Sequence, residues 1–121
     1  MRQFEDLVLM MRVNHRDSPW AKTQSANDWI LHTEAELQEL KHFTSPANAA
    51  EELGDVLQNW IASYIALEAE EGVCVLEEIL LSAQNKLLAR KPWLFDSRLP
   101  FPKDADEERA WVKLNKAKEK K

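Results

Sequence analysis

Four acidic residues stand at a spacing that suits metal chemistry. Glu36 and Glu39 are three residues apart, and so are Glu52 and Asp55. On a helix, residues at this separation are neighbours on one face. Four carboxylates brought together repel one another unless protons or a cation neutralise them. Such oxygen ligands suit Mg²⁺ or Mn²⁺, and magnesium usually leaves some coordination positions to water and to substrate phosphates.

A turn at Ser45 would bring the two acidic pairs together. Ser45 is followed by proline, the combination of capping hydroxyl and first-position proline that starts a helix. Glu39 lies six residues before Ser45 and Glu52 seven after it, while Glu36 lies nine before and Asp55 ten after. In an antiparallel helical hairpin, equal distance from the turn means equal height. The spacing predicts that Glu39 faces Glu52 and Glu36 faces Asp55, with a solvated acidic surface as the alternative.

The apolar pattern of the whole chain is helical and predicts an all-α bundle of about five helices. Two glycines and five prolines are too few for a protein of many short strands and turns. We expect one domain over residues 1–121, with residues 116–121 as a frayed tail. The expected helices begin near residues 4, 25, 46, 76 and 104. Gly72 is the expected end of the third helix.

The third helix carries more apolar surface than four short helices of one chain can cover. Trp60, Ile61, Tyr64 and Ile65 continue its apolar stripe. A large exposed apolar patch usually marks an interface. We therefore expect homo-oligomerisation to complete the core. By contrast, we expect the histidines to be surface residues, because only Glu39 and His42 form a Glu-x-x-His pair and a di-iron bundle normally needs two such pairs.

Composition narrows the function classes. The formal net charge of −5 argues against nucleic acid as the main partner, although one metal ion can invert the local field for a single nucleotide. Cys74 is the only cysteine, so an intramolecular disulfide is impossible. Neither a signal-peptide core nor an apolar run of membrane-spanning length occurs. We expect a cytoplasmic protein without a membrane partner.

Five segments together resemble one enzyme family. In chain order they are a Pro-Trp loop with a following glutamine (19–24), the E-x-x-E at 36–39, EELGD at 51–55, AEEG at 69–72, and KLLARKPWLF at 86–95. Their order and spacing are similar to those of the MazG family of nucleoside triphosphate pyrophosphohydrolases. The resemblance extends from Phe4 to Trp111. It implies an all-α fold completed by a second subunit, and hydrolysis of a nucleoside triphosphate to the monophosphate and pyrophosphate.

The resemblance also assigns roles to individual residues. It places the family's magnesium ligands at Glu36, Glu39, Glu52 and Asp55. Of these, we expect Glu36 or Glu39 to act as the catalytic base that takes a proton from the attacking water. The phosphate-binding basic pair falls on Lys86 and Arg90, which are one helical turn apart. The chain departs from the family where Cys-Pro-Trp-Asp is Ser-Pro-Trp-Ala and where the double arginine is Ala-Arg. These departures leave the metal and phosphate sites intact and put base recognition in doubt.

Three further residues are candidates for contact with the base. Trp20 and Gln24 could stack on it and hydrogen-bond to it, and Trp111 could cover it. Ordinary packing is the alternative for each, as we expect for Trp29 and Trp93.

These observations predict a nucleoside triphosphate pyrophosphohydrolase that depends on Mg²⁺, with Mn²⁺ as a possible substitute. We expect it to work as a homodimer or homotetramer and to remove unwanted nucleotides from the cellular pool (house-cleaning). One alternative is a specialised relative acting on dUTP, dCTP or phosphoribosyl-ATP. The other is a non-catalytic helical dimerisation module.

Overall fold

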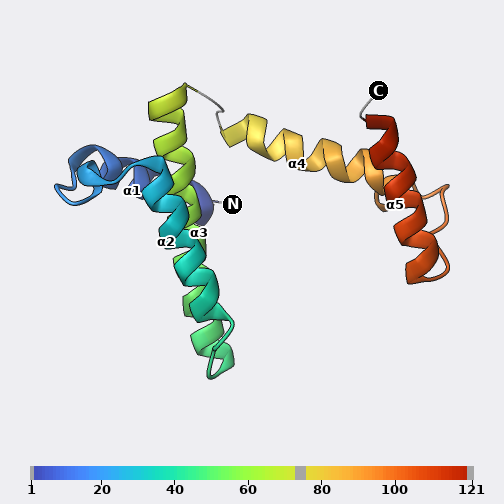
Figure 1. Ribbon diagram of the computed structural model, residues 1–121, viewed down its shortest axis with the longest axis horizontal. Helices are drawn as coiled ribbons and strands as arrows, with labels where there is room; N and C mark the ends of the chain where they lie inside the picture. Colours follow the sequence, from blue (N-terminus) through green and yellow to red (C-terminus); the bar gives the residue numbers. More distant parts are fainter. Residues whose placement is uncertain (1, 73–75, 120–121) are drawn as a thin grey trace. The chain divides into compact units, whose positions relative to one another are not determined.

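The structure, a computed structural model, describes residues 2–72 and 76–119, and all its regular elements are helical (Figure 1). Five α-helices and two short 3-10 helices are described, and these two ranges contain no strand. The all-α prediction is confirmed. Cys74 lies outside the described residues. In chain order the elements are α1 (Arg2–Asp17), η1 (Ala21–Thr23), α2 (Ala26–Leu40), α3 (Pro46–Glu71), α4 (Leu76–Arg90), η2 (Pro92–Leu94) and α5 (Ala105–Glu119).

The chain divides into two compact units, Met1–Cys74 and Val75–Lys121. The first contains α1, η1, α2 and α3, and the second contains α4, η2 and α5. The single domain over 1–121 stays a prediction. None of the described helices is long and apolar enough to cross a membrane.

Helix boundaries in the first unit follow from local capping chemistry. The Ser25 hydroxyl accepts a hydrogen bond from the Asp28 backbone N–H (3.1 Å), and the Asp28 carboxylate accepts one from the Ser25 N–H (2.9 Å). Ser45 caps α3 by accepting from Asn48 N–H (3.1 Å). Gly72 ends α3 at φ 63°, a left-handed conformation that favours glycine. The expected start and end of the third helix are confirmed.

The first unit is built on an antiparallel hairpin of α2 and α3, which lie side by side, with α1 packed against α3 (Figure 1). Small side chains let the two helices approach closely. The core cluster consists of Ala21, Ala26, Trp29, Ala62 and Ala66. Trp29 is its one large member, as expected for a packing tryptophan.

The apolar stripe of α3 is covered differently from our expectation. Ile61, Tyr64 and Ile65 are buried in this structure, so they are not the exposed interface that we predicted. Helices α1 and α2 both pack on α3, so one chain covers more of the stripe than the prediction allowed. The apolar side chains that α3 leaves exposed lie nearer its start, at Leu53 (55% exposed), Leu57 and Trp60 (37% each).

The second unit has little core of its own. Trp93 is buried, as expected for a packing residue, whereas Leu80 and Leu87 of α4 are about half exposed. Helix α5 starts where the Asp104 carboxylate accepts a hydrogen bond from Glu107 N–H (2.8 Å).

The frayed tail over residues 116–121 stays a prediction: residues 116–119 belong to α5, and residues 120–121 lie outside the described residues. Two contacts hold this end of the helix: Asn115 Nδ2 donates to the Arg90 carbonyl (3.0 Å), and Arg90 pairs with Glu119 (3.3 Å).

Candidate metal centre and nucleotide site

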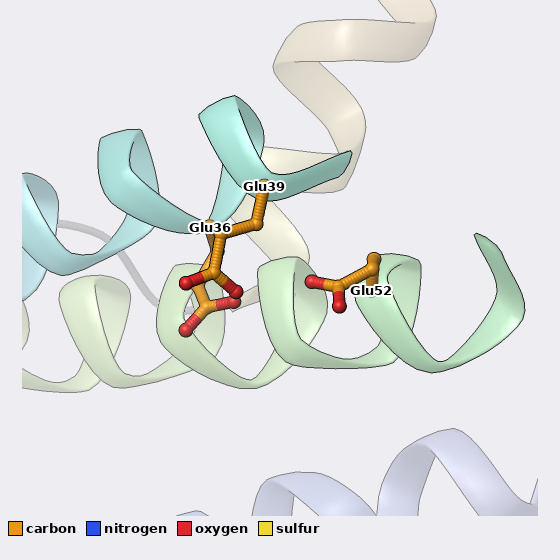
Figure 2. A group of neighbouring side chains, drawn as sticks. All are labelled: Glu36, Glu39 and Glu52. Atoms are coloured by element: carbon orange, nitrogen blue, oxygen red, sulfur yellow. The ribbon is translucent and has the colours of Figure 1, made fainter. Parts of the chain in front are cut away.

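Three of the four predicted acids converge between α2 and α3. Glu36 and Glu39 extend from α2 and Glu52 from α3 into the space between the two helices (Figure 2). One carboxylate oxygen of each lies within 4.8 Å of the others. Asp55 lies outside this group of three, but its charge acts on both Glu36 and Glu52.

The hairpin is not symmetrical about Ser45, so the predicted pairing at equal height is only approximate. The hydroxyls of Thr33 and Ser63 are 3.4 Å apart, yet Thr33 lies twelve residues before Ser45 and Ser63 eighteen after it. Likewise, the first N–H of α2, at Ala26, donates to the Glu70 carboxylate (2.9 Å). The glutamate carboxylates meet despite this offset because their side chains are long. The aspartate side chain is one methylene shorter.

Burial and repulsion between carboxylates raise the pKa of two carboxyls in the cluster. Burial, followed by the charges of Glu39, Asp55 and Glu52, raises the pKa of the Glu36 carboxyl. Burial, followed by the charges of Glu39 and Asp55, also raises the pKa of Glu52. Both shifts mean that the site disfavours a full set of negative charges.

Two carboxylate oxygens of the cluster are buried without a hydrogen-bond partner among the described residues. Oε2 of Glu36 and Oε2 of Glu52 are buried, and neither accepts a hydrogen bond from any described residue. The other oxygen of Glu52 accepts a long hydrogen bond from Asn48 Nδ2 (3.5 Å). Buried carboxylate oxygens normally have a donor or a cation. A hard divalent cation such as Mg²⁺ fits this all-oxygen donor set.

The predicted phosphate-binding pair lies in the second unit. Lys86 and Arg90 are both on α4, where Lys86 is exposed and Arg90 forms the ion pair with Glu119. The carboxylates lie in the first unit. A common site for the basic pair and the carboxylates therefore stays a prediction.

A hollow in the first unit lies close to the carboxylates along α3. Its volume is about 440 Å³, within the range of about 300–1,000 Å³ typical of ligand pockets. Its lining combines apolar and aromatic side chains with three amides: Leu7, Met10, Met11, Asn14, Trp20, Trp29, Gln58 and Asn59. Asn59 is four residues, or about 6 Å of helix rise, beyond Asp55, and its side chain donates to the Asp55 carbonyl (2.9 Å).

The three candidate base contacts have different surroundings. Trp20 lines the hollow and is 55% exposed. Gln24 is engaged internally, with its Oε1 2.8 Å from His32 Nε2 and its Nε2 donating to the Thr23 hydroxyl (3.0 Å). Trp111 lines a separate hollow of about 290 Å³ in the second unit, together with Trp93.

Sequence reasoning missed several residues here. His32 is not a plain surface residue: its ring is half buried and contacts Trp20 and Trp29. Asn14, Gln58 and Asn59 were also overlooked. The position of Asn59, one helical turn after Asp55, is the signal that could have revealed the amides.

Comparison with known proteins supports the fold. No family model matches the chain, and a search among curated proteins finds no match. Among solved structures, the fold is similar to the crystal structure of a MazG-related protein from Thermotoga maritima, with a TM-score of 0.82. The two share 24% sequence identity, and the similarity covers 93% of this chain and 98% of the other. The fold that the resemblance predicts is thus the fold that the chain adopts.

Proposed function

We propose that the protein is a Mg²⁺-dependent nucleoside triphosphate pyrophosphohydrolase, which cleaves a nucleoside triphosphate into the monophosphate and pyrophosphate. The observation that carries this proposal is the carboxylate cluster. Glu36, Glu39 and Glu52 bring oxygens within 4.8 Å of one another, and two buried oxygens of the cluster lack a hydrogen-bond donor. The MazG-like fold supports the same reaction class.

Glu36, Glu39, Glu52 and Asp55 are the residues that would hold the metal. When bound, Mg²⁺ supplies positive charge for phosphate oxygens and lowers the pKa of water. Mn²⁺, which accepts the same oxygen ligands, is expected to substitute.

The chain's own residues then have separate tasks. Glu36 or Glu39 would accept the proton of the water that attacks the α-phosphorus. Lys86 and Arg90 would stabilise the negative charge that develops on the departing pyrophosphate.

The hollow beside Trp20 is our proposed site for the base. Trp20 and Trp29 offer aromatic surface, and Asn14, Gln58 and Asn59 offer both donors and acceptors to a base edge. The base would then lie near the carboxylates along α3. No charged side chain lines the hollow among the described residues, so it suits an uncharged planar group.

Association with a second copy is part of the proposal. Leu53, Leu57 and Trp60 on α3 and Leu80 and Leu87 on α4 are exposed apolar residues that an interface would cover. We propose a homodimer or homotetramer that acts in the cytoplasm on the nucleotide pool.

The test is a panel of the common ribo- and deoxyribonucleoside triphosphates, with pyrophosphate and orthophosphate measured separately. We expect pyrophosphate as the first product, in the presence of Mg²⁺ or Mn²⁺ and not in excess EDTA. Orthophosphate as the first product would contradict the proposal, as would equal turnover in EDTA. Absence of turnover throughout the panel, with dimers present, would favour the dimerisation module.

A further inference from the structure

Trp20 is contacted both at its indole ring and at its backbone carbonyl, and one series of contacts joins the two. Its indole lies edge-on to Trp29 (ring centroids 5.4 Å apart) and tilted against the imidazole of His32 (5.6 Å). Its backbone carbonyl accepts a hydrogen bond from the Thr23 hydroxyl (2.6 Å). Gln24 links Thr23 to His32, so the chain of contacts closes on Trp20 itself.

The direction of each hydrogen bond in this chain is determined by the one before it. The Thr23 hydroxyl donates its single proton to Trp20, so it accepts from Gln24 Nε2. The Gln24 amide is thereby oriented with Oε1 toward His32. This oxygen only accepts, so His32 Nε2 carries a proton and donates to it.

The segment around Trp20 needs such support. Trp20 precedes η1, a 3-10 helix of three residues, and so short an element has little stability of its own. The indole is 55% exposed, so burial alone does not hold it. His32 and Trp29, by contrast, belong to α2, whose first turn is fixed by its capping box.

We propose that His32 and Gln24 are positioning residues that hold Trp20 as the aromatic wall of the base site. This inference rests on the proposed function. It reassigns Gln24 from the predicted contact with the base to a contact with His32 and Thr23. In the proposed arrangement His32 need not touch the nucleotide, and its effect on substrate binding passes through Trp20.

The test compares His32→Ala and Gln24→Ala with Trp20→Ala. We expect Trp20→Ala to raise KM for the best nucleotide at least about fivefold, since stacking on an aromatic wall contributes substantially to base binding. His32→Ala and Gln24→Ala should raise KM about threefold or more and change kcat less than about twofold, as expected when uniform binding is lost. Inhibition by inorganic tripolyphosphate, which has no base, should be unchanged in all three variants.

A double-mutant cycle distinguishes positioning from a separate contribution. His32→Ala should have no further effect in a Trp20→Ala background, because residues that act through one another are not additive. His32→Phe keeps the ring contact with Trp20 and should restore part of the lost affinity. His42→Ala, on an exposed histidine of the α2–α3 connection, is the matched control. Additive effects on KM, or weaker tripolyphosphate inhibition, would overturn the inference.

A second readout separates this inference from the proposed function. In protein labelled with 5-fluorotryptophan, the Trp20 signal is assigned by its loss in Trp20→Phe. His32→Ala and Gln24→Ala should shift or broaden this signal, whereas His42→Ala should leave it in place. This measurement needs no turnover, so an inactive wild type would contradict the proposed function without deciding the network. An unchanged Trp20 signal in both variants would overturn the network.

Discussion

Replacing Glu36 by glutamine removes one charge from the carboxylate cluster and nearly preserves the size of the side chain. Without metal, we expect Glu36→Gln to be more stable than wild type near pH 7.5. The reason is that burial and the charges of Glu39, Asp55 and Glu52 raise the pKa of the Glu36 carboxyl in the folded protein. An ionised Glu36 therefore costs folding free energy, and the amide does not.

The size of the effect follows from the geometry. Two unit charges 4.8 Å apart repel by about 0.9 kcal/mol in water and by about 3.5 kcal/mol at an effective dielectric constant of about 20. Glu39 is exposed to solvent, which places its repulsion with Glu36 toward the lower figure. We expect a gain of about 1–2 kcal/mol, or roughly 3–8 °C in Tm.

The pH dependence has a definite sign. Because the pKa of Glu36 is raised on folding, the folded state binds more protons than the unfolded state between the ordinary and the raised pKa. The free energy of unfolding of wild type should fall as pH rises through this range. The advantage of Glu36→Gln should be absent below the ordinary carboxyl pKa and complete above the raised one.

The assay is a series of thermal melts from pH 4 to pH 8, in EDTA and in excess Mg²⁺. At about one hundred times its Kd, Mg²⁺ should stabilise wild type by about 2.7 kcal/mol, and the variant, which lacks one ligand, by much less. Glu34→Gln is the matched control, since Glu34 lies on the same helix and is exposed. A lower apo Tm for Glu36→Gln, with equal Mg²⁺ shifts in both proteins, would show that these carboxylates are not one metal site.

Three other predictions concern the phosphate site, the glycine of α3 and the interface. Lys86→Ala and Arg90→Ala should each lower kcat/KM by an amount that corresponds to a loss of roughly 1.5–3 kcal/mol of transition-state stabilisation. The circular dichroism spectrum of both variants should be unchanged. Wild-type kinetics in both variants would place the phosphate contacts elsewhere. A methyl group at Gly54 would meet no atom within 4 Å beyond its chain neighbours and the adjoining backbone of its own helix. Gly54→Ala should therefore raise apo stability by about 1 kcal/mol in a denaturant titration. If it also lowers activity, that open space serves the substrate or a second copy. Light scattering of the wild type should give a mass above the 14.0 kDa of one chain. Leu57→Glu should lower this mass, because it places a charge in the proposed apolar interface. An active wild-type monomer would refute the interface.

The helical elements could be derived from the sequence because their signals are local. Ser45 with its proline and Gly72 determine the ends of α3 through bonds within a few residues. The spacing of the four acids likewise placed Glu36 beside Glu39 and Glu52 beside Asp55 without any tertiary information.

The offset of the hairpin was decided only by the tertiary structure. Distance from Ser45 predicted equal heights, but the helices settle where Ala26, Ala62 and Ala66 allow close packing around Trp29. The resulting convergence includes Glu39 and leaves Asp55 outside the group of three. A residue count along the chain cannot give this, because it carries no information on how two helix surfaces fit together.

The environment of each polar side chain was also beyond the sequence. The sequence predicted His32 as a surface residue and Gln24 as a base contact, whereas the fold places His32 against Trp20 and within hydrogen-bond distance of Gln24. The sequence by itself determined which helices form and which acids share a face, since these depend on neighbours a few residues away. Only the tertiary structure decided which of those acids are shielded from solvent and which residues contact Trp20. Both depend on contacts between residues that are distant in the chain.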